Sequence, residues 1–168
     1  ATKELIEKNG ITVDIVSIGG SPNMWEVEKI PIGTEYRIGT YIYNDRSLME
    51  RKVCREEDCA LTVLATVVST PTPQRAVVDA GSKVLTTDLF GLTGHGHIVD
   101  HAQLTISQLS EEHACIVSDG PTGLSIGQKV RIIPNHACVV SNMVDEVVFV
   151  DGCKVLKSQS VVARGKVL

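Results

Sequence analysis

The chain has 168 residues, of which 43% are hydrophobic, so it can bury the core of one domain or of a domain plus part of another. A formal net charge of −4 disfavours nucleic acid and anionic membranes as partners, because both are bound through basic patches. The longest apolar run, residues 60–68, is far shorter than the roughly 20 residues needed to span a bilayer, which predicts a soluble protein.

Helix and strand signals alternate in the first fifty residues. Residues 2–9, "TKELIEKN", are rich in charge and are followed by glycine, which predicts a helix that ends there. Residues 11–18, "ITVDIVSI", form a β-branched run, which predicts a strand buried on both faces. Gly19 and Gly20 then predict a tight turn, after which Ser21 caps a second helix. Helix followed by buried strand indicates an α/β unit.

The pattern changes from Thr34 onward. Residues 34–45 alternate like a strand, which would place Tyr41 and Tyr43 on one face, where they could pack or donate to an anion. The charge-rich residues 45–60 predict a short exposed helix or a connection.

From about residue 55 onward the sequence predicts an all-β domain. Short β-rich runs are separated by Gly, Pro and Asp turns at roughly the 8–12-residue spacing of a sandwich or barrel. The runs are residues 61–69, 74–81, 113–120, 128–134, 146–152 and 160–168. We therefore expect a mainly β protein whose C-terminal domain is a β-sandwich or is barrel-like.

Residues 132–142, "IIPNHACVVSN", hold a candidate metal pair. In an extended strand, His136 and Cys138 would point to the same face, about 6.6–6.8 Å apart along the chain, and could reach one ion. Two protein ligands are too few for a closed structural zinc site, so a bound metal would keep open positions. The alternative is a buried cysteine beside a solvated histidine, since the pair alone is a weak pattern.

The turn "SIGGSPN", residues 17–23, is a candidate anion site. A strand that runs into Gly19-Gly20 and then into a capped helix presents free backbone N–H groups and a helix dipole, and phosphate is the usual ligand. Ser17 and Ser21 add hydroxyl donors. An ordinary strand-to-helix turn is the alternative.

The other histidines and the cysteines give weaker signals. His95, His97 and His101 lie in a glycine-rich stretch, which favours a surface loop over a metal cluster, and the role of His113 stays open. The five cysteines are odd in number and form no CxxC pair, which favours reduced thiols and a cytoplasmic location.

Seven stretches of the chain, taken in order, resemble one family. They are "SIGGSPN", "YRIGTYIYND", "CALTVLATVVS", "RAVVDAGSKVLTTD", "LSEEHA", "GQKVRIIPNHACVVSNMVD" and "VVARGKVL". They are similar to the C-terminal part of the D-threonine aldolase/D-serine dehydratase family, whose members are pyridoxal-phosphate enzymes of the alanine racemase-like fold type III. The resemblance implies that residues 1–50 end a cofactor-binding, TIM-type (β/α) barrel. Residues 51–168 would then be the β domain that carries the metal site.

The resemblance also implies an activity. His136 and Cys138 match the family's two metal-binding positions, and a cysteine as the second ligand implies zinc. The intact protein would be a homodimeric lyase acting on small D-amino acids with a β-hydroxyl. It would be a D-serine dehydratase if the oxygen leaves, or a D-threonine aldolase if the Cα–Cβ bond breaks. The softness of a thiolate site slightly favours zinc and the dehydratase outcome.

The family's phosphate-binding positions fall on Gly19, Gly20, Ser21 and Tyr41. Two residues depart from the family pattern: Asn23 replaces a hydroxyl residue and Ile38 replaces a proline. The Schiff-base lysine belongs to the first strand of the family's barrel, and no lysine of this chain matches it. We therefore expect this chain alone to be inactive.

Two rival functions remain open. In one, the β domain is a non-catalytic interaction or dimerisation module in which the His-x-Cys pair is simply buried. In the other, it belongs to a racemase-like enzyme that needs no metal. Metal content and chelator sensitivity discriminate between these hypotheses and the lyase.

Overall fold

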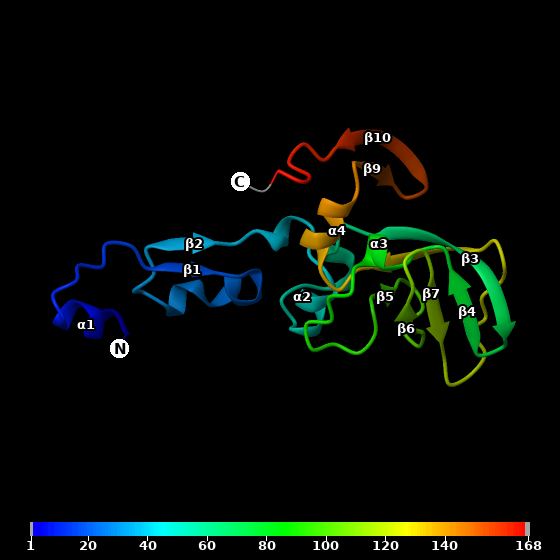
Figure 1. Cartoon of the computed structure of the whole chain (residues 1–168), viewed down its shortest axis with the longest axis horizontal. Helices are drawn as coiled ribbons and strands as arrows, with labels where there is room; N and C mark the ends of the chain where they lie inside the picture. The colour runs from blue at the N-terminus through cyan, green and yellow to red at the C-terminus, as the bar shows by residue number, and fades with distance from the viewer. Residues whose placement is uncertain (1, 167–168) are drawn as a thin grey trace.

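The computed structural model describes residues 2–166, which form a β barrel, an N-terminal arm and a C-terminal hairpin (Figure 1). The arm extends to one side of the barrel, and the hairpin stands above it. In this part of the chain, no helix has the length and hydropathy that a membrane crossing requires.

Six antiparallel strands form the barrel, in the order β5-β8-β3-β4-β7-β6. The long strand β3 pairs with β8 through its first residues and with β4 through its last. The register shifts lie in the pairing of β3 with β4. The two edge strands, β5 and β6, meet across the remaining gap, where the His95 amide donates to the Ile106 carbonyl at 3.0 Å. The strands are β3 (Val63–Thr72), β4 (Arg75–Val78), β5 (His97–Ile98), β6 (Thr105–Leu109), β7 (Ala114–Val117) and β8 (Lys129–Ile133). The predicted mainly β, barrel-like fold is confirmed.

The barrel interior is filled by the inward-facing residues of each strand. Burial alternates along β4 and β7, as expected when one face of a strand looks into a core. Ala76, Val78, Ile106, Ile116 and Ile132 are fully buried. Small and branched side chains therefore meet at the centre of a narrow barrel.

Gly81 lies where the chain leaves β4 and enters helix α3 (Ser82–Leu85), against the turn between β6 and β7. A Cβ atom at this position would lie 2.4 Å from the carbonyl oxygens of both Ser110 and Glu111. The Gly81→Ala variant is therefore expected to lose about 3 kcal/mol or more of unfolding free energy, because backbone must shift to admit the methyl group. Urea denaturation of the purified protein measures this loss.

Gly120 provides the matched control. A Cβ there would meet nothing within 4 Å, and its φ lies outside the left-handed range. The Gly120→Ala variant should keep or slightly raise the stability, because alanine reduces the entropy of the unfolded chain. Equal stabilities of the two variants would contradict the close approach at Gly81.

The N-terminal arm contains less regular structure than the sequence predicts. The predicted first helix is confirmed, but residues 11–16 form no strand, and the run expected to be buried on both faces is largely exposed. The strand of that run, β1, pairs in parallel with β2 in a two-stranded sheet. The arm elements are α1 (Thr2–Lys8), β1 (Ser17–Gly19), the 3₁₀ helix η1 (Ser21–Lys29) and β2 (Glu35–Arg37).

Short helical turns join the arm to the barrel. The predicted strand over residues 34–45 is wrong beyond Arg37, because the chain turns into a 3₁₀ helix at Thr40. Tyr41 lies inside that helix and Tyr43 caps it, so they do not alternate along one strand face. The connecting elements are η2 (Thr40–Ile42), α2 (Arg46–Glu50) and η3 (Glu56–Asp58).

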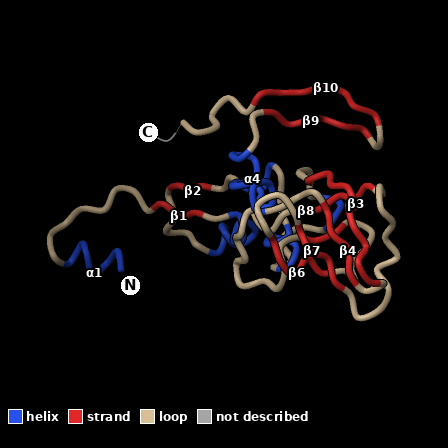
Figure 2. Tube along the Cα trace, turned by 45° about the vertical axis from the view of Figure 1, so that its right-hand side comes forward, coloured by secondary structure: helices blue, strands red, loops and turns tan. Residues whose placement is uncertain are grey.

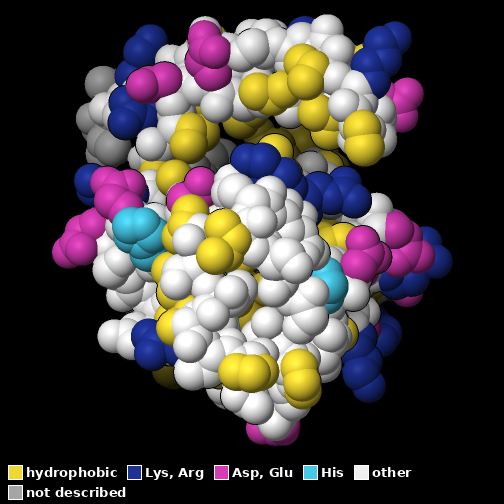
Figure 3. Space-filling model, turned by 90° about the vertical axis from the view of Figure 1, so that its right-hand side faces the viewer, with side chains coloured by type: hydrophobic (Ala, Val, Ile, Leu, Met, Phe, Trp, Pro, Cys, Tyr) yellow, Lys and Arg dark blue, Asp and Glu magenta, His cyan; other side chains and the backbone are white. Residues whose placement is uncertain are grey.

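The C-terminal hairpin pairs β9 (Glu146–Asp151) with β10 (Lys154–Ser160). Its apolar side chains are exposed on both strands, among them Val148 at 57% and Val155 at 65%. Figure 3 shows apolar side chains on the hairpin above a hollow that separates it from the barrel. The predicted run over residues 160–168 is wrong, because residues 161–166 form no strand, and residues 167–168 lie outside the described part.

Candidate functional site

The His-x-Cys pair lies at the start of a helix rather than on a strand. Strand β8 ends at Ile133, and helix α4 runs over Ala137–Met143, so Cys138 is helical and His136 is the extended residue that precedes the helix. The predicted shared strand face is therefore wrong, because the Pro134-Asn135 step ends the strand. Figure 2 shows α4 among the helical segments gathered where the arm meets the barrel.

Asp45 holds the start of α4 from a distant part of the chain. It is fully buried, and its Oδ2 accepts a hydrogen bond from the Ala137 amide at 3.0 Å. Its Oδ1 accepts from the Leu48 amide at 3.1 Å and from the Ser47 hydroxyl at 2.7 Å. One carboxylate therefore satisfies the first turns of both α2 and α4. The residue between the two candidate metal ligands is fixed to the connection that leads into the barrel.

Asn135, next to His136, is also fully buried. Its side-chain amide donates to the carbonyls of Asp88 and Gly94, each at 2.9 Å. Its side-chain oxygen accepts from the Arg46 guanidinium at 3.3 Å. The backbone immediately before His136 is therefore held by hydrogen bonds from three separate segments.

The His136 ring is oriented by two side chains. Nδ1 lies 3.1 Å from Asp88 Oδ2, and the Phe90 ring packs edge-on at 4.7 Å between centroids, with 87° between the planes. Because a carboxylate accepts, Nδ1 carries the proton and Nε2 keeps a lone pair. Nε2 makes no hydrogen bond within residues 2–166. That nitrogen is available to a metal.

Cys138 is exposed, and its sulfur lies 3.2 Å from the Thr40 hydroxyl of η2. Thr40 therefore positions the sulfur, since either the hydroxyl or the thiol can donate in this contact. No group of three or more His, Cys, Asp or Glu side chains in the described part of the chain could hold a metal. Two donors, an imidazole nitrogen and a sulfur, are of the types that bind soft divalent ions, and two ligands alone would leave open positions on such an ion.

The predicted phosphate turn also fits an anion. Gly20 has φ 105°, and the following Ser21 is 3% exposed with a buried hydroxyl that has no hydrogen-bond partner among the described residues. A Cβ on Gly19 would lie 3.0 Å from the Arg37 guanidinium, which also donates to the Ser17 hydroxyl at 2.8 Å. A turn with an unpaired buried hydroxyl at Ser21 and a guanidinium against Gly19 offers the kinds of group that bind a phosphate.

The structure keeps the predicted phosphate residues in two places, the turn of the arm and η2. Gly19, Gly20 and Ser21 are contiguous in the arm, whereas Tyr41 is 55% exposed in η2. The residue before Tyr41 is Thr40, which contacts Cys138. A single short helix therefore carries one predicted phosphate residue and one partner of the metal pair.

Sequence reasoning missed the residues that support the pair, namely Thr40, Asp45, Asp88 and Asn135. Asp45 precedes a helix and so had a capping signal for α2, but nothing in the sequence links it to α4, 92 positions later. Arg37 was missed because its contact with Gly19 depends on the pairing of β1 with β2.

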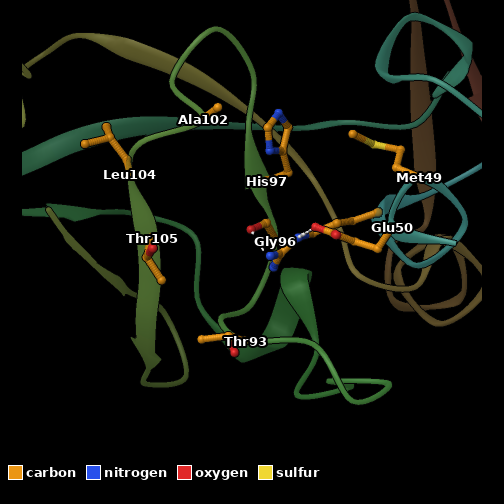
Figure 4. Close-up of a pocket in the computed structure, with 9 residues that line it drawn as sticks. Met49, Glu50, Thr93, Gly96, His97, Ala102, Leu104 and Thr105 are labelled. Atoms are coloured by element: carbon orange, nitrogen blue, oxygen red, sulfur yellow. Dashed lines mark hydrogen bonds and ion pairs between the residues drawn. The ribbon is translucent and has the colours of Figure 1, made fainter. Parts of the chain in front are cut away.

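A pocket of about 360 Å³ lies elsewhere, between α2 and the β5–β6 side of the barrel (Figure 4). Its cation, Arg46, already donates to the carbonyls of Gly94 and Gly96 and lies 3.5 Å from Glu50. His97 at its wall bonds Glu56 at 2.8 Å. The pocket is lined by Arg46, Met49, Glu50, Thr93, Gly96, His97, Ala102, Leu104 and Thr105. Its charged groups are paired, and it contains neither member of the His-x-Cys pair.

The thiols of Cys54 and Cys59 should be the least reactive of the five. Burial, followed by the neighbouring Cys54, raises the pKa of Cys59 to about 12, and burial also raises the pKa of Cys54. Both thiols therefore stay protonated at pH 8, where iodoacetamide should label the exposed Cys138 and Cys153 first. Mass spectrometry of peptides taken over time measures the order.

Denaturation provides the control, because all five cysteines should label at similar rates in guanidinium. Unfolding returns these thiol pKa values to about 8.5, so stability is fully present below that pH and falls as pH rises towards 12. Early labelling of Cys59 in the folded protein would contradict its burial.

Comparisons with known proteins show the family of the chain. A family profile described as a putative serine dehydratase domain matches residues 60–150. An uncharacterized protein of Mycobacterium tuberculosis is 41% identical over 129 residues, which are 73% of this chain and 96% of that protein. The D-threo-3-hydroxyaspartate dehydratase of Delftia sp. is 29% identical over 153 residues, which are 80% of this chain and 40% of that enzyme.

Solved structures match over almost the whole chain. D-threonine aldolase from Filomicrobium marinum has a TM-score of 0.79 at 27% identity, covering 99% of this chain and 46% of the aldolase. The Delftia dehydratase has a TM-score of 0.77 at 25% identity, covering 94% of this chain and 47% of the dehydratase. Two matching structures of that dehydratase are alanine variants, one of a histidine and one of a cysteine two positions later, the second in a metal-free form. The chain therefore spans less than half of the characterised enzymes that it matches.

Proposed function

Because the chain belongs to the D-serine dehydratase/D-threonine aldolase family, we propose that it is the C-terminal part of a pyridoxal-phosphate- and metal-dependent lyase for D-β-hydroxy amino acids. Its barrel corresponds to the C-terminal domain of alanine racemase-like enzymes. The substrate class follows from the matching dehydratases and aldolases, which are named for D-serine, D-threonine and 3-hydroxy-D-aspartate.

One observation supports the proposal most strongly, the His136–Cys138 pair at the start of α4. The Nε2 of its ring makes no hydrogen bond within residues 2–166, and its thiol is exposed beside the Thr40 hydroxyl. The two alanine variants of the matching dehydratase replace the same residue types at the same spacing. We assign His136 and Cys138 as ligands of Zn²⁺, which would stabilise negative charge on the substrate's β-oxygen.

The arm would hold the cofactor phosphate. We assign Gly19, Gly20 and Ser21 to this role, and Tyr41 from η2, because the turn has a buried hydroxyl without a partner at Ser21 and the Arg37 guanidinium against Gly19. Pyridoxal phosphate, when bound, supplies an electron sink for the substrate's α-carbon. Ser21 would donate to the phosphate, and the Arg37 charge would balance it.

The rest of the proposal concerns the whole protein. Residues 1–50 would end the cofactor-binding barrel, and residues 51–168 would form the metal-carrying β domain. The lysine that binds the cofactor would come from the remainder of the barrel, so this chain alone would not turn over substrate. The intact enzyme would be a homodimer in the reducing cytoplasm, in keeping with five free thiols.

The decisive experiment assays the intact protein, barrel included, on D-serine and D-threonine with and without a chelator. Pyruvate and ammonia from D-serine indicate dehydration, whereas glycine and acetaldehyde from D-threonine indicate aldol cleavage. We expect the chelator to abolish activity and Zn²⁺ to restore it. Racemisation at the same rate with and without the chelator would instead support a metal-independent racemase-like enzyme. Absence of all three reactions in protein loaded with cofactor and zinc would support an interaction module.

A further inference from the structure

We propose that Asp88 is a positioning residue that fixes the tautomer and orientation of His136, so that Nε2 is the metal-binding nitrogen. This inference rests on the proposed function, because it concerns the same metal pair. Asp88 itself would not touch the metal. It would act only through the histidine ring.

The contact geometry supports this role. Asp88 Oδ2 lies 3.1 Å from Nδ1, and Phe90 closes the ring from another side with edge-on packing at 4.7 Å. With Nδ1 bound to a carboxylate and one ring edge against Phe90, rotation of the imidazole is restricted. A histidine without these partners would populate both tautomers, and only one of them offers Nε2 as a ligand.

Both backbone groups of Asp88 form hydrogen bonds that hold the residue in place. Its carbonyl accepts from the fully buried Asn135 side chain at 2.9 Å, and its amide donates to the Thr86 hydroxyl at 3.4 Å. Asn135 precedes His136 in the chain, so Asp88 is linked to this segment twice. Its carboxylate contacts the His136 ring, and its backbone carbonyl accepts from the Asn135 side chain. The contact between Asp88 and His136 is therefore already formed without a metal. Metal-binding histidines commonly have such a carboxylate partner on the ring nitrogen that does not bind the metal.

The backbone around Asp88 is strained, which is unusual for non-glycine residues. Thr86 has φ 62° and Phe90 has φ 50°, both in the left-handed range. Threonine and phenylalanine rarely adopt this conformation, because it brings the side chain against the backbone. Two strained residues on either side of Asp88 indicate that the loop is shaped to place its carboxylate and the Phe90 ring against His136.

A simple surface ion pair is the competing explanation. The side chains of His136 and Asp88 are 23% and 40% exposed, and ion pairs at such exposure contribute little to stability. A surface pair predicts a small change in stability and no change in metal affinity. A positioning residue predicts a clear loss of metal affinity when it is removed. Measurement of metal affinity therefore discriminates between the two explanations.

The test measures Zn²⁺ affinity of the full protein by competition with a chromophoric chelator, in wild type, Asp88→Ala, Asp88→Asn and His136→Ala. Asp88→Ala should bind Zn²⁺ about 10–100-fold more weakly, as loss of such a partner does. Asp88→Asn should recover most of the affinity, since its amide oxygen still accepts from Nδ1. Asp119→Ala, at an exposed aspartate, is the matched control and should bind as wild type.

A second readout needs no metal. In apo protein, ¹⁵N chemical shifts of His136 should show the Nδ1–H tautomer in wild type, and a shift towards Nε2–H in Asp88→Ala. If His136→Ala destroys binding while Asp88→Ala matches wild type in both affinity and tautomer, the role of Asp88 is overturned and the metal site stands. If His136→Ala binds Zn²⁺ as wild type does, the proposed metal site itself fails.

Discussion

Replacing Cys138 by alanine should lower the Zn²⁺ affinity of the protein by about two to three orders of magnitude, the share of one ligand in a typical zinc site. The thiolate is one of only two protein ligands that we assign, so no neighbouring group can take its place. Its side chain is exposed and fills no part of the core, so the unfolding free energy should change by less than about 0.5 kcal/mol. Competition titration and urea denaturation measure the two quantities.

Cys153 provides the matched control for this variant. It is also an exposed free cysteine, but it lies in the turn of the β9–β10 hairpin. Cys153→Ala should bind Zn²⁺ as wild type does. If both cysteine variants lose the same small amount of zinc, the bound metal is adventitious and the assignment of Cys138 is wrong.

Replacing Asp45 by alanine should lower the unfolding free energy by about 3–5 kcal/mol. The change leaves three donors without their acceptor: the amides of Leu48 and Ala137 and the Ser47 hydroxyl. Each buried donor without a partner costs about 1–3 kcal/mol. A typical domain has only about 5–15 kcal/mol of stability in total. Because Ala137 lies between the two assigned ligands, zinc affinity should fall as well.

Two further aspartate variants serve as an intermediate case and a control for the loss of stability. Asp45→Asn keeps the shape and one acceptor oxygen, so its loss should be intermediate. Asp119→Ala removes an exposed carboxylate and should change stability by less than about 0.5 kcal/mol. A stability of Asp45→Ala equal to that of Asp119→Ala in urea denaturation would show that water replaces the lost acceptor.

The barrel could be predicted from the sequence because its strands carry local signals. Alternating apolar residues and Gly, Pro or Asp turns mark the strands β3, β4, β7 and β8. The strand β6 was missed because "TISQL" is largely polar and has only one fully buried residue, Ile106. The strand β5 has two residues and depends on pairing with β8 rather than on its own sequence.

The arm shows where local reasoning fails. The β-branched residues 11–16 favour a strand, but they have no neighbouring strand to pair with in the described chain. A strand needs a partner that the sequence of the strand itself does not specify. The prediction for the His-x-Cys segment was wrong in its secondary structure, while the assignment of the two residues as ligands stays a prediction. Pro134 and the distant Asp45 together make the segment helical.

If Cys138 is a metal ligand, as we propose, the choice of metal is separate from the folding of the chain. Ala137 is buried and fixed by Asp45, whereas the neighbouring Cys138 is exposed and contacts only the Thr40 hydroxyl among the side chains described. A carboxylate at position 138 would exchange a soft donor for a hard one and shift preference from Zn²⁺ towards Mn²⁺ or Mg²⁺. It would also remove a sulfur that peroxide can oxidise. One surface position can therefore retune both ion selectivity and oxidant tolerance while the barrel is left intact.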